Sequence, residues 1–176
     1  KHPWLTDVDK QRPRQSNTVL FTGCLGLMQP DVILAALDLV HRIDPDAQAL
    51  GGLKYCCGDI HLRTGHPEAS IANFTNLVRA LDTFSPKNVV FICPTCKSYF
   101  DLHKPDTEWS WHFITEFLID HLDKLGEFKE IKAKVTIHDA CHLVRGEEPD
   151  SETPRKILSA IPGIDLIEIE NSKETS

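Results

Sequence analysis

The chain has 176 residues, of which 41% are hydrophobic, and its formal net charge is −7. This composition suffices for one domain with its own apolar core, and the acidic balance without long basic runs argues against nucleic acids and anionic membranes as partners. No apolar stretch approaches the roughly 18 residues that a membrane span needs, and the first residues lack the apolar segment of a signal peptide. We therefore expect a cytoplasmic protein with no transmembrane segment.

Short strands alternate with helices along the chain after a polar arm at residues 1–16. The strands are predicted from short apolar runs of β-type residues, and the helices from apolar residues at helical spacing, often behind a proline in the first turn. In chain order the pattern predicts a strand at 18–21, a helix opened by Pro30, a weak strand at 53–55, a helix from about Pro67, a strand at 88–92, a short helix after Cys96, an edge strand at 109–111, a long helix at 114–125, a strand at 134–138, a short helix at 154–160 and a strand at 165–169.

This alternation is typical of an α/β fold with a short, mostly parallel sheet flanked by helices. In such folds, ligands lie beyond the carboxyl ends of the strands. Five of the six cysteines come just after a predicted strand, and Cys96 follows three residues after Cys93. We therefore expect one edge of the sheet to gather cysteines from segments that are far apart in the sequence.

The chain also repeats part of itself. Residues 19–24 resemble residues 135–141, since each is a strand that ends in a cysteine and is followed by a turn, an amphipathic helix and another strand. The second unit stops close to the point at which its own cysteine pair would follow. We therefore divide the chain into a linker or arm at 1–16, a first repeat at 17–130 and the start of a second, truncated repeat at 131–176.

The cysteine spacing is Cys24-x31-Cys56-Cys57-Gly58-x34-Cys93-x2-Cys96. The last two cysteines lie three residues apart at a helix start, so both sulfurs face one side, and the unpaired N–H groups there favour thiolates. The adjacent pair needs a kinked backbone, for which the following glycine supplies the freedom. Thiolates are the usual ligands of iron–sulfur clusters, and an adjacent pair can bind two different metal atoms.

This pattern resembles the CCG, or cysteine-rich, domain of the heterodisulfide reductase B/D family. Relatives of that family include DsrK-like proteins and the iron–sulfur subunits of glycolate and lactate oxidation systems. Residues 111–118 resemble the family's His…Glu-Phe-Leu helix, and residues 137–143 resemble the start of its second repeat. The resemblance extends over about residues 17–170, although a second Cys-Cys-Gly, a second Cys-x-x-Cys and a ferredoxin motif are missing.

The resemblance implies a redox subunit or domain of a larger oxidoreductase, for electron transfer or for thiol/disulfide reduction. Its partners would be other redox subunits, and a disulfide is a candidate substrate. The implied cofactor is a noncubane [4Fe–4S] cluster held by Cys24, Cys56, Cys57, Cys93 and Cys96, with Cys141 as a candidate ligand of a second site.

Other interpretations of the cysteines stay open at this stage. A Cys-x-x-Cys pair with two further thiolates also suits a tetrahedral zinc site, in a zinc-stabilised or metal-free interaction domain without redox activity. Buried cysteines can also be inert packing. His138 and His142 flank Cys141 and are candidate ligands, as is His112, but histidines in such places more often make local hydrogen bonds.

Overall fold

A computed structural model describes residues 14–24 and 26–173, so most of the predicted arm at 1–16 lies outside the described residues. Within the described part, no helix combines the length and the hydropathy that crossing a bilayer requires. The elements are β1 (Thr18–Phe21), the 3₁₀ helix η1 (Gly26–Met28), α1 (Pro30–Ile43), β2 (Gln48–Leu50), η2 (Leu53–Tyr55), α2 (Asp59–Arg63), α3 (Pro67–Asp82), β3 (Asn88–Phe91), α4 (Pro94–His103), β4 (Ser110–Phe113), α5 (Ile114–Ile119), η3 (Leu122–Lys124), β5 (Ala133–Val135), α6 (Cys141–Val144), α7 (Glu152–Ser159) and β6 (Ile164–Leu166).

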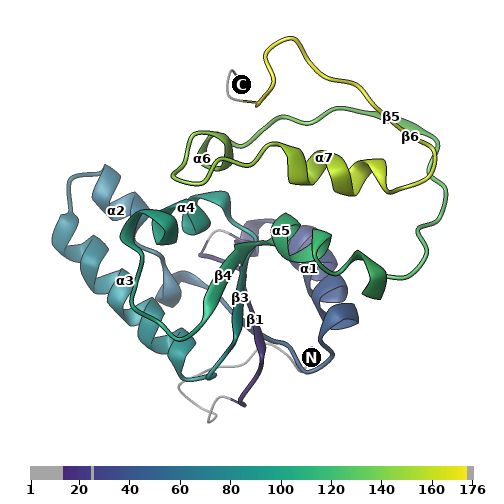
Figure 1. Cartoon of the computed structure of the whole chain (residues 1–176). Coiled ribbons are helices and arrows are strands. Elements are labelled where there is room, and N and C mark those ends of the chain that lie inside the picture. The colour runs from purple at the N-terminus through teal and green to yellow at the C-terminus, as the bar shows by residue number, and fades with distance from the viewer. Residues whose placement is uncertain (1–13, 25, 174–176) are drawn as a thin grey trace.

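Four parallel strands form the main sheet, in the order β2-β1-β3-β4 (Figure 1). In the centre, Leu20 of β1 pairs with Ala49 of β2 on one side and with Val90 of β3 on the other. β4 is an edge strand, where His112 pairs with Val90. Because all four strands are parallel, their carboxyl ends lie at the same edge of the sheet. The expected α/β class with a parallel sheet is confirmed.

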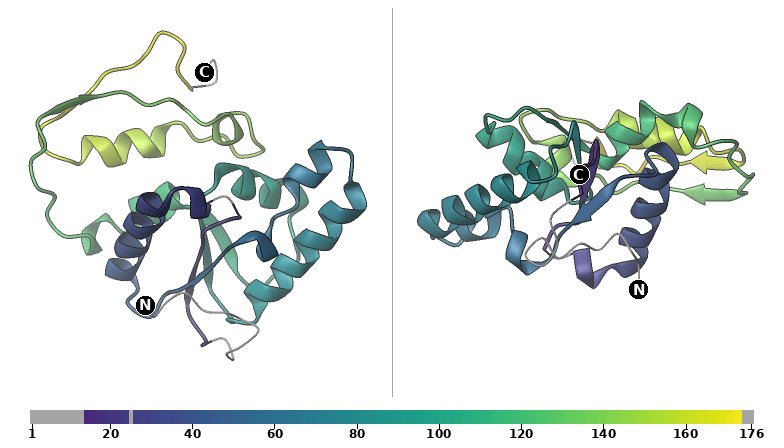
Figure 2. Two further views of the ribbon diagram at one scale, coloured as in Figure 1. Left: turned by 180° about the vertical axis from the view of Figure 1, so that it is seen from behind. Right: turned by 90° about the horizontal axis from the view of Figure 1, so that it is seen from below.

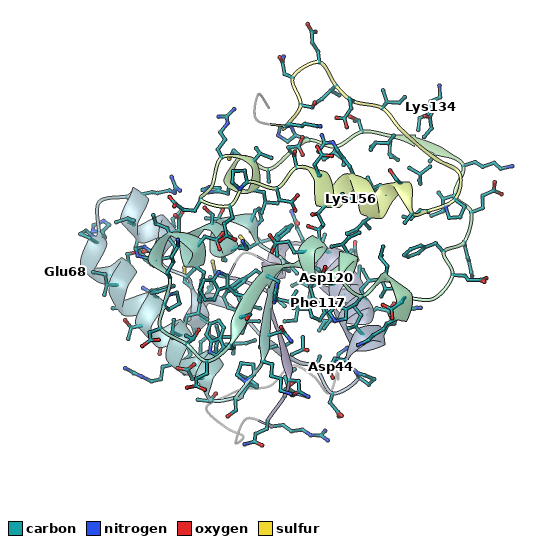
Figure 3. The ribbon with its side chains drawn as sticks, viewed as in Figure 1. Asp44, Glu68, Phe117, Asp120, Lys134 and Lys156 are labelled. Atoms are coloured by element: carbon teal, nitrogen blue, oxygen red, sulfur yellow. The ribbon has the colours of Figure 1, made fainter. Side chains whose placement is uncertain are left out.

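The central strands are buried on both faces, because helices cover each face (Figure 2). Phe21 and Phe91 pack toward α3 and α4, with their ring centroids 5.4 Å apart. Leu20 and Val90 point to the opposite face, where α1 and α5 lie and where Phe117 joins the interior (Figure 3). Each such side chain, once fully buried, contributes about 1.5–3 kcal/mol of hydrophobic stabilisation. The two cores hold the sheet rigidly behind its carboxyl edge.

The C-terminal unit is a second, smaller sheet with its own helices. β5 and β6 pair in parallel, with Val135 opposite Leu166, and α7 lies between them in the sequence. This order repeats that of β1, α1 and β2 in the main sheet. Since α6 packs against α4 and α7 packs against α5, the unit lies beside the carboxyl edge of the main sheet (Figure 1).

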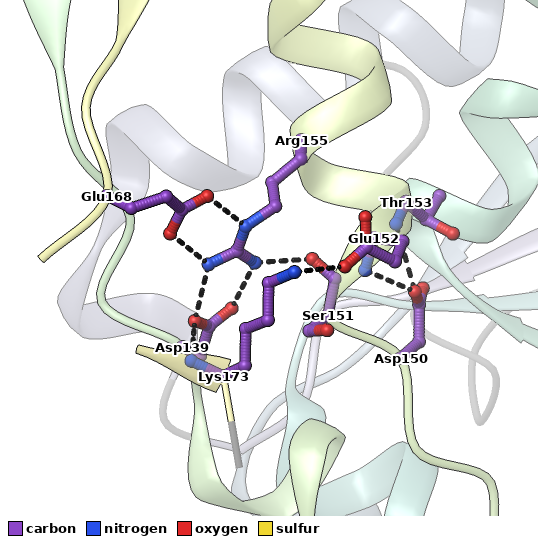
Figure 4. A network of polar contacts seen from close by, with 8 residues as sticks. All are labelled: Asp139, Asp150, Ser151, Glu152, Thr153, Arg155, Glu168 and Lys173. Carbon is purple, nitrogen blue, oxygen red and sulfur yellow. Dashed lines mark hydrogen bonds and ion pairs between the residues drawn. The ribbon is translucent and has the colours of Figure 1, made fainter. Parts of the chain in front are cut away.

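A buried arginine holds the C-terminal unit together (Figure 4). Arg155 of α7 donates two hydrogen bonds of 2.8 Å to Asp139, and two more, of 2.6 and 2.8 Å, to Glu168. It also donates to the carbonyl of Ser151, while the backbone N–H of Lys173 donates to Asp139 at 2.7 Å. A buried guanidinium needs partners for its charge and its N–H groups. These contacts therefore fix the loop before α6 relative to α7.

The weak strand predicted at 53–55 is wrong, because these residues form η2. The strand that pairs with β1 is β2, where Ala49 and Leu50 are buried, whereas Leu53 is 77% exposed. The apolar Leu53 misled the prediction, since its side chain faces solvent. As a result, Cys56 and Cys57 follow a 3₁₀ helix and not a strand.

The long helix predicted at 114–125 is broken into α5 and η3. The break follows α5 because His121 leaves the helical conformation and its ring nitrogen Nδ1 lies 2.8 Å from the carbonyl of Phe117. The strand predicted at 134–138 ends earlier, at Val135, so Cys141 opens α6 instead of following directly on a strand. α2 was not predicted at all.

Candidate functional site

One cavity at the carboxyl edge of the main sheet gathers five of the six cysteines. Its volume is about 470 Å³, which is within the range of pockets for small ligands. Three of the five thiols are buried and two are half-buried. The cysteines therefore gather at the edge that the strand ends predict, and the thiols that line the cavity belong to Cys24, Cys56, Cys57, Cys93 and Cys96.

A tight turn after β1 positions Cys24. The N–H of Thr22 donates to the carbonyl of Leu50 at 2.9 Å, which extends the pairing of β1 with β2. Gly23 has a φ of 72°, a left-handed conformation that favours glycine. Gly51 approaches the same turn so closely that a Cβ there would lie 1.9 Å from Thr22 Oγ1. The two glycines let the ends of the two strands come together at the cavity.

The turn at Gly58 positions the adjacent Cys56 and Cys57. Gly58 has a φ of 98°, and a Cβ there would lie 2.5 Å from the carbonyl oxygen of Ser70. The Ser70 hydroxyl donates to the Gly58 carbonyl at 2.8 Å and lies 2.5 Å from the Tyr99 hydroxyl. The Gly58 N–H in turn points at the Cys56 sulfur, 3.4 Å away. Only glycine fits this turn, because both the conformation and the space exclude a side chain.

The start of α4 positions Cys93 and Cys96. Cys93 is the N-cap residue, and Pro94 occupies the first turn. Proline is tolerated there because backbone N–H groups in the first turn have no partner within the helix, so its lack of an N–H costs no hydrogen bond. The neighbouring Cys96 thiol and the N–H groups of Cys96 and Thr95 at the helix start favour the ionised sulfur and lower the pKa of Cys93 to about 6. In the metal-free protein at neutral pH, this cysteine is therefore a thiolate, the form that binds metals.

The five sulfurs form one continuous set. Interaction with the Cys96 thiol lowers the pKa of Cys57, and the neighbouring Cys57 and Cys93 together with burial raise the pKa of Cys96. Burial raises the pKa of Cys56 to about 11, and the neighbouring thiols of Cys24 and Cys57 add to this shift. Cys56 and Cys57 therefore link the thiol from β1 with the pair at the start of α4.

The donor set has the soft thiol ligands that an iron–sulfur cluster requires. Among the described residues, no three His, Cys, Asp or Glu side chains are grouped closely enough to hold a single metal ion. Five soft thiols around a larger space, with apolar Val32, Ile60 and Ile92 completing the wall, match the chemistry of an iron–sulfur cluster.

The C-terminal unit contributes His142 to the wall of this cavity. Cys141 is exposed and is not part of the wall, and His138 is exposed as well. His112 lies on β4, where its ring is 3.2 Å from Asn88 Oδ1 and burial lowers the pKa of His112. Of the three candidate histidines, the structure thus brings only His142 to the cysteines.

Sequence reasoning missed an ion pair in the cavity wall. Asp59 of α2 is 8% exposed, and its carboxylate lies 2.6 Å from Nε of Arg63, a contact that raises the pKa of Arg63. The signal that could have revealed the pair is an acid directly after Cys-Cys-Gly and a base four residues later, which is the spacing of one helical turn.

A buried lysine behind the cavity was also missed. Lys97 is 3% exposed, and its ammonium lies 2.9 Å from Asp101, 3.5 Å from Glu116 and 3.7 Å from Glu148. Burial lowers the pKa of Lys97, but these three carboxylates outweigh the effect and raise it. Because Lys97 follows Cys96 directly, this cluster connects the start of α4 with α5 and with the loop before α7.

Three known proteins illustrate what the chain is similar to. One subunit of the fumarate reductase (CoM/CoB) of Methanothermobacter marburgensis is 33% identical over 153 residues, which is 85% of this chain and 30% of that protein. One subunit of the dihydromethanophenazine:CoB–CoM heterodisulfide reductase of Methanosarcina barkeri is 30% identical over 171 residues, 91% of this chain and 42% of that protein. An uncharacterized iron–sulfur protein of Methanococcus maripaludis is 33% identical over 152 residues, 85% of this chain and 30% of that protein.

The chain spans less than half the length of each of these relatives. No solved structure matches it significantly. The family model of the cysteine-rich domain named CCG matches residues 18–101, which contain all five cavity cysteines, and matches again at residues 135–176. With more than half of its residues covered by this model, the chain belongs to the CCG family of cysteine-rich domains.

Proposed function

We propose that this chain is the iron–sulfur domain of a multisubunit oxidoreductase. In this proposal, the five cavity cysteines hold one noncubane [4Fe–4S] cluster, and the domain transfers electrons or reduces a thiol/disulfide couple. The observation that carries the proposal is that five thiols from three distant segments line a single cavity at the strand ends. The relatives support it, since one is named as an iron–sulfur protein and two as reductase subunits.

The geometry of the thiols favours a cluster over the alternative zinc site. A mononuclear zinc needs four ligands around one point, and no three metal-binding side chains among the described residues are grouped in that way. The adjacent Cys56 and Cys57 would instead bind different metal atoms. A bound iron–sulfur cluster would supply one-electron redox chemistry.

The chain's own residues would prepare and protect the cluster. Cys93 offers a thiolate at neutral pH, whereas Cys56 and Cys96 must release protons when they bind metal, because their pKa values are raised. Val32, Ile60 and Ile92 place apolar side chains beside the thiols, and such apolar surroundings tune the reduction potential of a bound cluster.

The partners in this proposal are other redox subunits or domains that donate and accept the electrons. A disulfide is a candidate substrate, and the cytoplasm is the compartment in which the thiols would stay reduced. Support comes from the two relatives that are named as reductase subunits.

The test is metal and sulfide analysis of protein that is purified without oxygen. We expect about four iron and four sulfide per chain, as the formula of the cluster requires, with broad visible absorption that dithionite bleaches. One zinc per chain, with no visible absorption and no sulfide, would instead identify a zinc-stabilised interaction domain and overturn the proposal.

A further inference from the structure

Two side chains of the cavity wall can donate hydrogen bonds to a ligand, and neither belongs to the thiol set. Arg63 comes from α2 in the main unit, and His142 comes from α6 in the C-terminal unit. Metal binding does not explain Arg63, since guanidinium groups are not usual metal ligands in proteins, and His142 is not one of the five thiols that would hold the cluster. They therefore raise the question of what these groups contact at the cavity.

Arg63 is held in place but keeps most of its hydrogen-bonding capacity. Its Nε donates to Asp59 at 2.6 Å, while Nη1 and Nη2 have no partner among the described residues. The Asp59 side chain is almost fully enclosed, whereas that of Arg63 is 60% exposed. The carboxylate thus orients the guanidinium, and two terminal N–H-bearing nitrogens remain available at the mouth of the cavity.

His142 is half-buried, and its ring has no hydrogen-bond partner in the part of the chain that the structure describes. Its neighbour Cys141 lies close enough to Arg63 to contribute to the raised pKa of Arg63. The end of α2 and the start of α6 both border the cavity, since the guanidinium of Arg63 and the imidazole of His142 belong to the same wall.

The remaining wall between these two groups and the thiols is largely apolar. Val32 and Ile60 both line the cavity and are about half exposed. A ligand that is complementary to this wall has an apolar body, which contacts the apolar side chains, and one anionic end, which accepts hydrogen bonds from Arg63 and His142. A guanidinium with free terminal nitrogens suits the two oxygens of a carboxylate or phosphate group.

We propose that Arg63 and His142 form an oxyanion subsite, at which a small organic anion binds with its apolar body along Val32 and Ile60 and its far end toward the thiols. This inference rests on the proposed function, because it names the class of molecule on which the proposed redox centre would act. Because the whole chain carries a net charge of −7, it repels anions in general, and an anion can bind only where side chains such as Arg63 and His142 offer N–H donors to its oxygens.

The test is calorimetric titration of the full chain under anaerobic, reducing conditions, before and after loading with iron and sulfide. Butyrate is the anionic probe, 1-butanol is its neutral counterpart with the same carbon chain, and inorganic phosphate is the second oxyanion. We expect butyrate to bind with one-to-one stoichiometry and 1-butanol to bind more weakly by about tenfold or more, since charged hydrogen bonds account for the difference.

Arg63→Gln and His142→Gln should each weaken butyrate binding about tenfold. Arg42→Gln is the matched control, because Arg42 also pairs with an aspartate four residues earlier, at 3.0 Å, but lies on α1 away from the cavity. If Arg63→Gln fails to fold with Asp59 left unpaired, the double variant Arg63→Gln/Asp59→Asn removes both charges of the pair and tests the same loss.

Equal binding of butyrate and 1-butanol, no binding of either oxyanion, or full binding in the Arg63 and His142 variants would each overturn the inference. Binding of phosphate but not butyrate, with the same dependence on both residues, would keep the oxyanion subsite and assign it to a phosphate group. If every variant takes up iron but anion binding does not depend on Arg63, this inference is refuted and the proposed function is not. Oxyanion binding in a chain that takes up no cluster would refute the proposed function alone.

Discussion

Replacement of Gly58 by alanine tests the turn that holds the two adjacent cysteines. The new Cβ would lie 2.5 Å from the carbonyl oxygen of Ser70 and 3.0 Å from its hydroxyl, at a φ of 98°. A left-handed conformation costs a non-glycine residue about 1–2 kcal/mol, and overpacking of a close contact costs about 1–3 kcal/mol more. We therefore expect Gly58→Ala to lower the free energy of unfolding by roughly 2–5 kcal/mol.

Gly65→Ala is the control, since Gly65 also has a positive φ, of 84°, but a Cβ there would meet no atom within 4 Å. It should lose only the conformational share, about 1–2 kcal/mol. Urea unfolding of the reduced, metal-free protein, followed by circular dichroism, measures both losses. If the two variants lose the same free energy, the approach of Gly58 to Ser70 does not constrain the turn, and the reasoning is refuted.

Cys57→Ser should lower the iron bound after anaerobic reconstitution, whereas Cys141→Ser should not, because Cys141 is exposed outside the cavity; equal iron contents would contradict the five-thiolate site. In metal-free protein, alkylation of Cys93 by iodoacetamide should show a midpoint near pH 6, its pKa in the fold, and a midpoint near the ordinary value of 9.0 would contradict its hydrogen bonding. Arg155→Leu should lower the free energy of unfolding by about 3–5 kcal/mol, because it leaves the buried carboxylate of Asp139 without its partner, and an unchanged urea midpoint would argue against this network. Arg155 holds the pKa of Asp139 below its ordinary value of 3.8. The stabilisation from this pair is therefore complete above pH 3.8 and is lost as the pH falls through the lower pKa that Asp139 has in the fold. Arg155→Leu should therefore lose less stability in acid than the unchanged protein, as measured by urea unfolding at a series of pH values.

The main sheet and the edge that carries the cavity could be predicted from the sequence. Residues 19–21 and 89–91 are continuous apolar runs, and in the fold their valine, leucine and phenylalanine side chains are fully buried. Both runs end two or three residues before a cysteine, so the position of Cys24 and Cys93 at one edge followed from the parallel topology alone.

The rest of the cavity depends on contacts that no local pattern reveals. β2 has only three residues and is defined by its pairing with β1, and α2 is a five-residue helix that contacts α3. Such short elements depend on tertiary packing more than on intrinsic propensity. For the same reason Arg63, on α2, was not foreseen. His142 reaches the cavity because α6 packs on α4, a contact between residues far apart in the sequence.

The parallel order of the main sheet also sets when the thiol cavity can form as the chain folds. The cysteines of its wall follow β1, η2 and β3, so they meet only after α1 and α3 have crossed over the sheet. Contacts between such distant segments form slowly, and an unfolded chain offers only isolated thiols and two local pairs. Metal uptake would therefore follow folding, and the bound metal would stabilise the folded domain and not the unfolded chain. The iron content of a preparation would then report how much of its protein had folded before the metal was supplied.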